Sequence, residues 1–188
     1  EQEKLPWYKR FVRSVFPCKG DSKANVIRKI ILLLLALAIV ACVAYIVNYY
    51  VDTAKHNALE GDLKELVGQA ADGVPAEIAP RFGALWSANN DFKGWLTLPG
   101  TKTDNPVVQY TDNDYYLKKD FQKEDNRYGT LYIDAGNRLT PTEMSRNITI
   151  YGHNMKDGSM LGDAQQKYRK LTFYKSNPVL TFSTAYSQ

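Results

Sequence analysis

His153 is the residue whose type and surroundings most favour chemistry in this chain. It follows an apolar, β-branched run, Ile148-Thr149-Ile150, and precedes a loop that holds Asp157 and Gly158. A strand end that carries an imidazole to a loop is a common way to present a general acid or base. From the residues alone, His153 is either such a group or a hydrogen-bonded structural histidine.

A metal site around His153 would need further ligands. Asp157 and Asp163 are nearby in sequence, but no second His or Cys stands at ligand spacing. The alternating acidic residues of a calcium loop are also missing. We therefore expect no metal here. The other histidine, His56, falls among polar residues of a helical pattern, where it is predicted to be exposed.

An apolar segment determines on which side of the cell membrane His153 is expected to lie. Residues 30–51 carry no charge, and as a helix they would span about 33 Å, against about 30 Å of bilayer hydrocarbon. Residues 1–29 hold eight basic and three acidic side chains. Because basic residues favour the cytoplasmic side, we predict a single-pass cell-membrane protein with a cytoplasmic N-terminus and residues 52–188 outside.

The charge and the cysteines exclude other classes. The leader carries net +5, so the remaining residues sum to −1 of the total of +4, and a nucleic-acid partner is not expected. Cys18 lies in the leader and Cys42 in the apolar run, so the exported part has no disulfide. Residues 39–42 loosely resemble a lipobox, which would make Cys42 a lipid anchor. The apolar run continues to Val47, however, and this favours a span.

Four segments are predicted: a basic leader (1–29), a transmembrane helix (30–51), an extracellular helical segment (52–90) and a β domain (91–188). Helical spacing covers residues 52–72 and 78–88. Turn residues then separate short β-like runs, which predict an antiparallel barrel or sandwich with an unpaired edge. These runs are 94–98, 107–110, 129–133, 147–151, 171–174 and 179–182.

A resemblance to a known family rests on motifs in this order and spacing. They are Asn90-Asp91-Phe92-Lys93-Gly94-Trp95-Leu96, Leu98-Pro99-Gly100-Thr101, Asn105-Pro106-Val107-Val108-Gln109, residues 112–121 and residues 150–163. Together they resemble the class B sortases, cysteine transpeptidases of Gram-positive cell surfaces. The resemblance implies a mostly β fold, a sortase-type closed β-barrel of eight strands that is incomplete here.

The resemblance also implies a site of His, Cys and Arg without metal or organic cofactor. His153 matches the catalytic histidine, and Asn113 and Leu117 fall where the family lines its sorting-signal groove. The family's cysteine and arginine positions lie downstream of Gln188. We therefore expect a C-terminally incomplete chain that is inactive alone.

The implied function is attachment of surface proteins to the cell wall. The enzyme would cleave a C-terminal sorting signal and join the protein to an amine of a peptidoglycan precursor or a pilin. The alternative is a degenerate, non-catalytic sortase-like membrane protein that binds sorting signals or partners.

Overall fold

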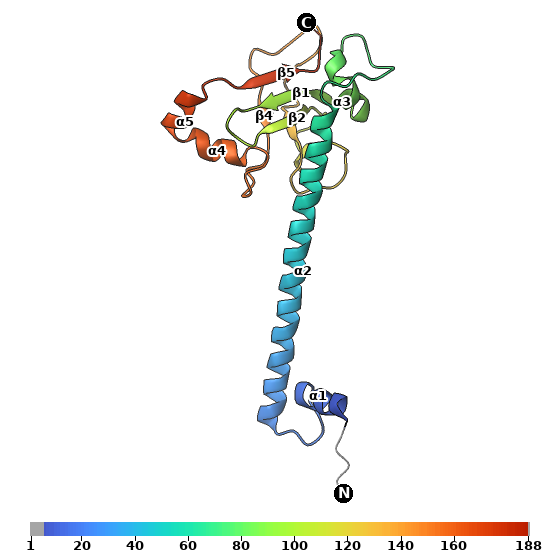
Figure 1. Cartoon of the computed structure of the whole chain (residues 1–188), viewed down its shortest axis with the longest axis vertical. Coiled ribbons are helices and arrows are strands. Elements are labelled where there is room, and N and C mark those ends of the chain that lie inside the picture. The colour runs from blue at the N-terminus through green and yellow to red at the C-terminus, as the bar shows by residue number, and fades with distance from the viewer. Residues whose placement is uncertain (1–5, 188) are drawn as a thin grey trace. The chain divides into compact units, whose positions relative to one another are not determined.

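The computed structural model describes residues 6–187, so the first five residues of the predicted leader and Gln188 lie outside the described residues. The chain divides into two compact units, 1–53 and 54–188. The division falls inside α2 (Lys23–Leu66), the longest helix in Figure 1.

The first unit contains α1 (Trp7–Val15) and the first part of α2. The hydroxyl of Ser22 accepts a hydrogen bond from the amide of Asn25 at 3.3 Å, which caps the start of α2. In the part of the chain that the structure describes, α2 is the one helix long and apolar enough to cross a membrane.

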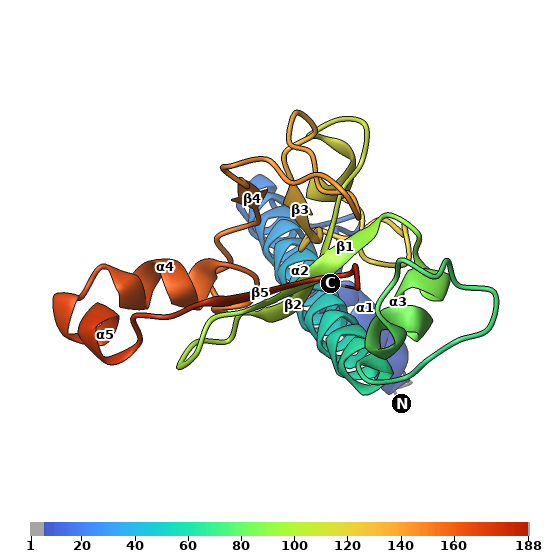
Figure 2. The same ribbon diagram turned by 90° about the horizontal axis from the view of Figure 1, so that it is seen from above.

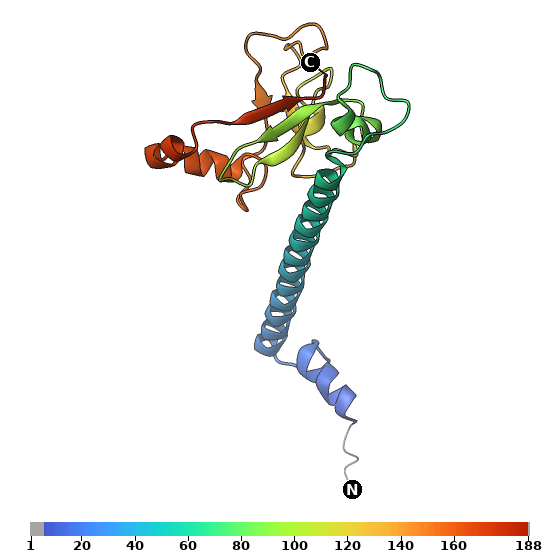
Figure 3. The same ribbon diagram turned by 45° about the horizontal axis from the view of Figure 1, so that its top comes forward.

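The second unit is built on a five-stranded sheet in the order β4-β3-β2-β1-β5. The strands are β1 (Phe92–Thr97), β2 (Asp104–Val108), β3 (Leu131–Ile133), β4 (Ile150–Tyr151) and β5 (Thr181–Thr184). Strand β1 pairs antiparallel with β2 and β5, and these three run side by side in Figure 3. Strand β2 pairs parallel with β3, which pairs antiparallel with β4.

The sheet is open across residues 54–187, with β4 and β5 at its edges. Sequence analysis expected a closed barrel that is incomplete in this chain, and the described strands close no barrel. Five of the six expected strand runs overlap an observed strand, with boundaries that differ by at most three residues. The parallel β2–β3 pair was not foreseen. It requires the crossover 109–130, which holds the 3₁₀ turn η2 (Tyr115–Leu117).

The strand predicted at residues 171–174 was wrong. These residues begin α5 (Leu171–Ser176), which follows α4 (Gly162–Tyr168), and both helices project to one side of the sheet in Figure 2. The β-forming side chains of this run have no neighbouring strand to pair with. Phe173 instead packs edge-on against Tyr168, with ring centroids 5.1 Å apart.

The core of the second unit joins the end of α2 to the sheet. Leu63 of α2 is buried with Phe92 and Trp95 of β1 and with Leu85. Leu85 lies on α3 (Gly83–Ala88), which follows the 3₁₀ turn η1 (Pro80–Phe82). A second buried cluster lies among β1, β2 and β3, from Leu96, Val107 and Leu131. The helix predicted at residues 52–72 is therefore the end of α2, which stops at Leu66.

The prediction that His56 is exposed was also wrong. Its side chain is 2% exposed and stacks on the ring of Tyr128, with centroids 4.0 Å apart and planes 5° from parallel. Burial lowers the pKa of His56, against the opposing effect of the Asp157 carboxylate. The local polarity of the sequence is misleading here, because His56 and Leu63 share the helix face that packs on the domain.

Glu60 lies one turn after His56 on the same face of α2. Its carboxylate accepts a hydrogen bond from the Nδ2 amide of Asn105 at the start of β2. Burial raises the pKa of Glu60 from 4.5 to about 7, against the lowering effects of Asn105 and Lys64. Helix and sheet are therefore joined by a contact whose charge changes near neutral pH.

This contact predicts a pH dependence of folding. A raised pKa means that the stability contributed by protonated Glu60 is complete below pH 4.5 and is lost as the pH rises through about 7. We expect the free energy of unfolding of the parent, relative to Glu60→Gln, to fall over that interval. Urea titration of the full chain in detergent micelles, followed by tryptophan fluorescence, measures it.

Glu65→Gln is the matched control, because Glu65 is exposed on the same helix. A Glu60→Gln difference that stays constant from pH 4.5 to 7 would contradict a raised pKa of Glu60.

Candidate active site

His153 lies just past β4, after a single glycine. A Cβ at Gly152 would collide with the side chain of Leu131 of β3, so a larger residue there would have to displace this buried side chain. The imidazole is half-buried, and its Nε2 lies 2.7 Å from the backbone carbonyl of Leu117. When Nε2–H donates to that carbonyl, Nδ1 is the nitrogen that is able to accept a proton.

An open cleft lies beside this imidazole. Its volume is about 580 Å³, and it is lined by Leu117, Lys118, Asp125, Asn126, Arg127 and His153. The backbone amide of Asn126 donates to the carbonyl of Lys118 at 2.8 Å, which holds the two walls together. The cleft thus combines one imidazole with apolar, basic and acidic groups.

The carbonyl that orients His153 is itself positioned by a buried hydroxyl. Tyr116, next to Leu117 in η2, is 1% exposed. Its hydroxyl donates to Asp91 at 2.7 Å and accepts from the Nδ2 amide of Asn89 at 2.9 Å. Burial raises the pKa of Tyr116 far above its usual value, so the hydroxyl remains a donor at every physiological pH.

Gly129 lies against the same backbone. Its φ of 61° is in the left-handed region, and a Cβ there would stand 2.5 Å from the carbonyl oxygen of Tyr116 and 2.9 Å from that of Leu117. The path of η2, and with it the acceptor for His153, therefore depends on the absence of a side chain at position 129.

Of the other two predicted site residues, Leu117 lines the cleft and Asn113 does not. The Nδ2 amide of Asn113 donates to Asp134 at 3.0 Å, and its Oδ1 accepts from the amide of Ala135 at 2.8 Å. The amide of Gly136, the hydroxyl of Tyr151 and Asn113 together lower the pKa of Asp134. Asn113 thus fastens the loop after β3, and its role in a groove stays a prediction.

Four cleft residues were not singled out from the sequence. Lys118 lies in the 112–121 motif but was given no role there, and Asp125, Asn126 and Arg127 lie outside the motifs. The guanidinium of Arg127 donates to the hydroxyl of Tyr128 at 3.0 Å. Only the fold of the 109–130 crossover brings these side chains to His153.

Two further observations limit the chemistry. No three His, Cys, Asp or Glu side chains come close enough to hold a metal ion within residues 6–187. Residues 54–188 contain no cysteine, since Cys18 and Cys42 both belong to the first unit. Residues 54–188 therefore bring an imidazole to the cleft, and they contain no thiol.

Comparison with known proteins gives this arrangement a context. Sortase B of Listeria monocytogenes is 37% identical over 115 residues, which are 61% of this chain and 46% of that protein. Sortase B of Staphylococcus aureus is 29% identical over 159 residues, which are 85% of this chain and 64% of that protein. The chain thus spans about half to two thirds of these relatives. No protein-family model matches it.

Solved structures agree. Sortase B from B. anthracis in complex with AAEK1 has a TM-score of 0.66 at 30% identity, covering 73% of this chain and 65% of that one. The Staphylococcus aureus sortase B–substrate complex has a TM-score of 0.63 at 28% identity, covering 73% and 62%. The second unit therefore has a sortase fold. More narrowly, the chain is a relative of the class B sortases.

Gly129→Ala tests the support of the site. We expect a loss of about 1–3 kcal/mol in the free energy of unfolding, because alanine is strained at this φ and meets the η2 carbonyls. The imidazole ¹⁵N shifts of His153 should also move, since its acceptor is displaced. Urea titration and NMR of the full chain in micelles measure both effects.

Gly61→Ala is the control, because no atom lies within 4 Å of a Cβ at that helical position. It should stabilise by about 0.5–1 kcal/mol and leave the His153 shifts in place. If Gly129→Ala were as stable as the parent, with unchanged shifts, the proposed support would be wrong.

Proposed function

We propose that this chain is part of a class B sortase and contributes the membrane anchor, one wall of the sorting-signal groove and the acid/base histidine. The observation that carries the proposal is His153, at the end of β4 and beside a cleft of about 580 Å³, in a chain related to class B sortases. In the complete protein, we expect the open sheet to be part of a closed barrel.

The proposed reaction uses two groups, a cysteine thiolate as the nucleophile and the His153 imidazole as the acid and base. A cysteine thiolate attacks the carbonyl carbon of the sorting-signal threonine, the C–N bond breaks, and His153 gives a proton to the departing amine. An amine of a peptidoglycan precursor or pilin then attacks the thioacyl enzyme. His153 takes its proton, and the thiolate leaves. The hydrogen bond to the Leu117 carbonyl supports this role because it fixes the orientation of the ring.

The proposed location follows from α2 and the charges before it. Residues 30–51 would cross the cell membrane, and Arg28 and Lys29 at their start would stay on the cytoplasmic side. The second unit would then face the cell wall. The segments proposed are the leader (1–29), the span (30–51), the helical part (52–90) and the β domain (91–188).

The proposal predicts which chains cleave peptides. The 188-residue chain should not cleave a fluorogenic sorting peptide above the level of its His153→Ala variant, because residues 54–188 supply no thiolate. A longer protein encoded by the same gene, if it includes the cysteine, should cleave the fluorogenic peptide. There, His153→Ala should lower kcat/KM by about 10²–10⁴-fold. Lys156→Ala is the control, because Lys156 is exposed in the same loop.

The same peptide distinguishes the sortase proposal from a second candidate function, that of a non-catalytic protein that binds sorting signals. The cleft beside His153 supports it, since binding a peptide in that cleft requires no cysteine. Fluorescence anisotropy of the labelled peptide with the full chain reports binding without cleavage. If a cysteine-containing gene product cleaves the peptide at the same rate with and without His153, the sortase proposal is wrong.

A further inference from the structure

Helix α1 has two chemically different faces. At about 100° per residue, Trp7, Tyr8, Phe11, Val12 and Val15 fall within an arc of about 140°. The opposite arc is formed by Lys9, Arg10, Arg13 and Ser14. An apolar face rich in aromatic residues beside a basic face is typical of helices that lie in a membrane interface.

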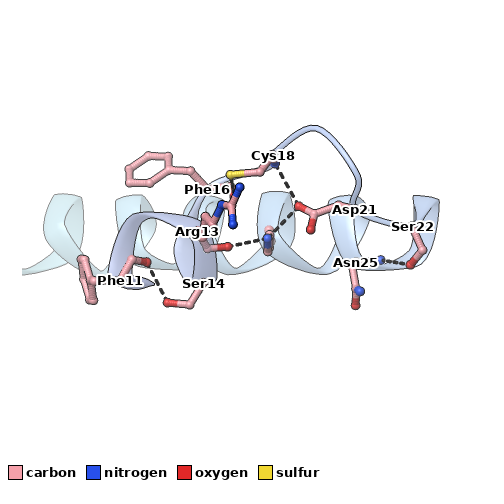
Figure 4. A network of polar contacts seen from close by, with 9 residues as sticks. Phe11, Arg13, Ser14, Phe16, Cys18, Asp21, Ser22 and Asn25 are labelled. Atoms are coloured by element: carbon pink, nitrogen blue, oxygen red, sulfur yellow. Dashed lines mark hydrogen bonds and ion pairs between the residues drawn. The ribbon is translucent and has the colours of Figure 1, made fainter. Parts of the chain in front are cut away.

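The apolar face of α1 is uncovered. Trp7 is 79% exposed and Phe11 60%, and Phe16, just after the helix, is 47% exposed. Figure 4 shows the rings of Phe11 and Phe16 outside the polar network of this segment. No residue of α1 is buried. An exposed apolar face of this kind is unfavourable in water, which indicates that it contacts lipid or another protein.

A polar clasp fixes α1 to the start of α2. Lys29 is only 6% exposed, and its ammonium donates to the carbonyl of Arg13 at 2.6 Å and to Asp21 at 2.7 Å. The amide of Cys18 also donates to Asp21, at 2.9 Å (Figure 4). Lys29 lowers the pKa of Asp21, so the clasp remains ionic at neutral pH.

The position of the clasp sets the depth of α1. Lys29 is the last charged residue before the apolar run that begins at Ile30. It binds the carbonyl of Arg13, in the last turn of α1. A span that begins at Ile30 would therefore hold the end of α1 at the level of the lipid headgroups.

We propose that α1 binds the surface of an anionic phospholipid leaflet. Its aromatic face enters the boundary between headgroups and acyl chains, and Lys9, Arg10 and Arg13 contact the phosphates. This inference rests on the proposed membrane anchor. Three observations favour lipid over a protein partner: the interfacial aromatic residues, the basic opposite face, and the continuity with α2.

Spin labels on the full chain in bilayers test the proposal. In a Cys18→Ser, Cys42→Ala background, one label is placed at Phe11→Cys and another at Arg10→Cys. Because the second label removes a charge, Phe11→Cys is also measured with Arg10→Gln. Collisions with oxygen report lipid, and collisions with a soluble nickel chelate report water. Native Cys42, labelled in Cys18→Ser, reports whether the span is in the bilayer.

With phosphatidylglycerol in the bilayer, we expect the label at position 11 to meet oxygen and the label at position 10 to meet nickel. Lys9→Gln, Arg10→Gln and Arg13→Gln together should lower the ratio of lipid-bound to water-exposed label about a hundredfold, at about fivefold per residue. Pure phosphatidylcholine should give a similar loss. The same charge change at Lys19, Lys23 and Arg28 should cost far less.

Two results would overturn the proposal while leaving the anchor intact, with Cys42 still in lipid. In the first, the label at position 11 meets nickel in anionic bilayers. In the second, it is shielded from both reagents, which would mean that protein covers α1. A label at Cys42 that meets nickel would overturn the anchor and this inference together.

Discussion

The buried hydroxyl of Tyr116 is the contact on which the candidate site depends. It joins the start of the sheet, through Asn89 and Asp91, to the crossover that carries the chain from β2 to β3. A parallel strand pair needs such a long connection, and a long connection has many conformations to lose. Satisfying a buried hydroxyl at one point restricts η2, whose next carbonyl orients His153. The orientation of the His153 imidazole is thus set by a backbone carbonyl that lies far from it in sequence.

The end of α2 meets the second unit through polar as well as apolar contacts. Leu63 supplies ordinary burial, whereas His56 stacks on Tyr128 and Glu60 accepts from Asn105. Tyr128 in turn donates to Asp157, in the loop that follows His153. Buried polar contacts contribute little net stability but fix one arrangement, because any other arrangement leaves a desolvated group unpaired. The helix and the loop that follows His153 are therefore linked by side chains that offer few alternatives.

Charge organises the first unit in a different way. Lys29 is buried in a clasp, while the basic residues of α1 stay exposed beside an uncovered aromatic face. An ammonium withdrawn from water requires compensating acceptors, and the Arg13 carbonyl and Asp21 provide them. Lys29 therefore has a structural role in the clasp, and the basic residues of α1 remain available to contact an anionic surface.

The sequence by itself determined the apolar run of α2, the positions of β1 and β5 to within a few residues, and the end of β4 beside His153, because hydrophobic patterning and turn residues act locally. The family motifs added the role predicted for His153. Only the tertiary structure decided that residues 171–174 form a helix, that His56 is buried and that Leu117, but not Asn113, lines the cleft. Each of these outcomes depends on which distant segment supplies a neighbour. Residues 171–174 would need a partner strand to form a strand. His56 is buried because the ring of Tyr128 covers it. The cleft is formed because two distant segments supply its walls.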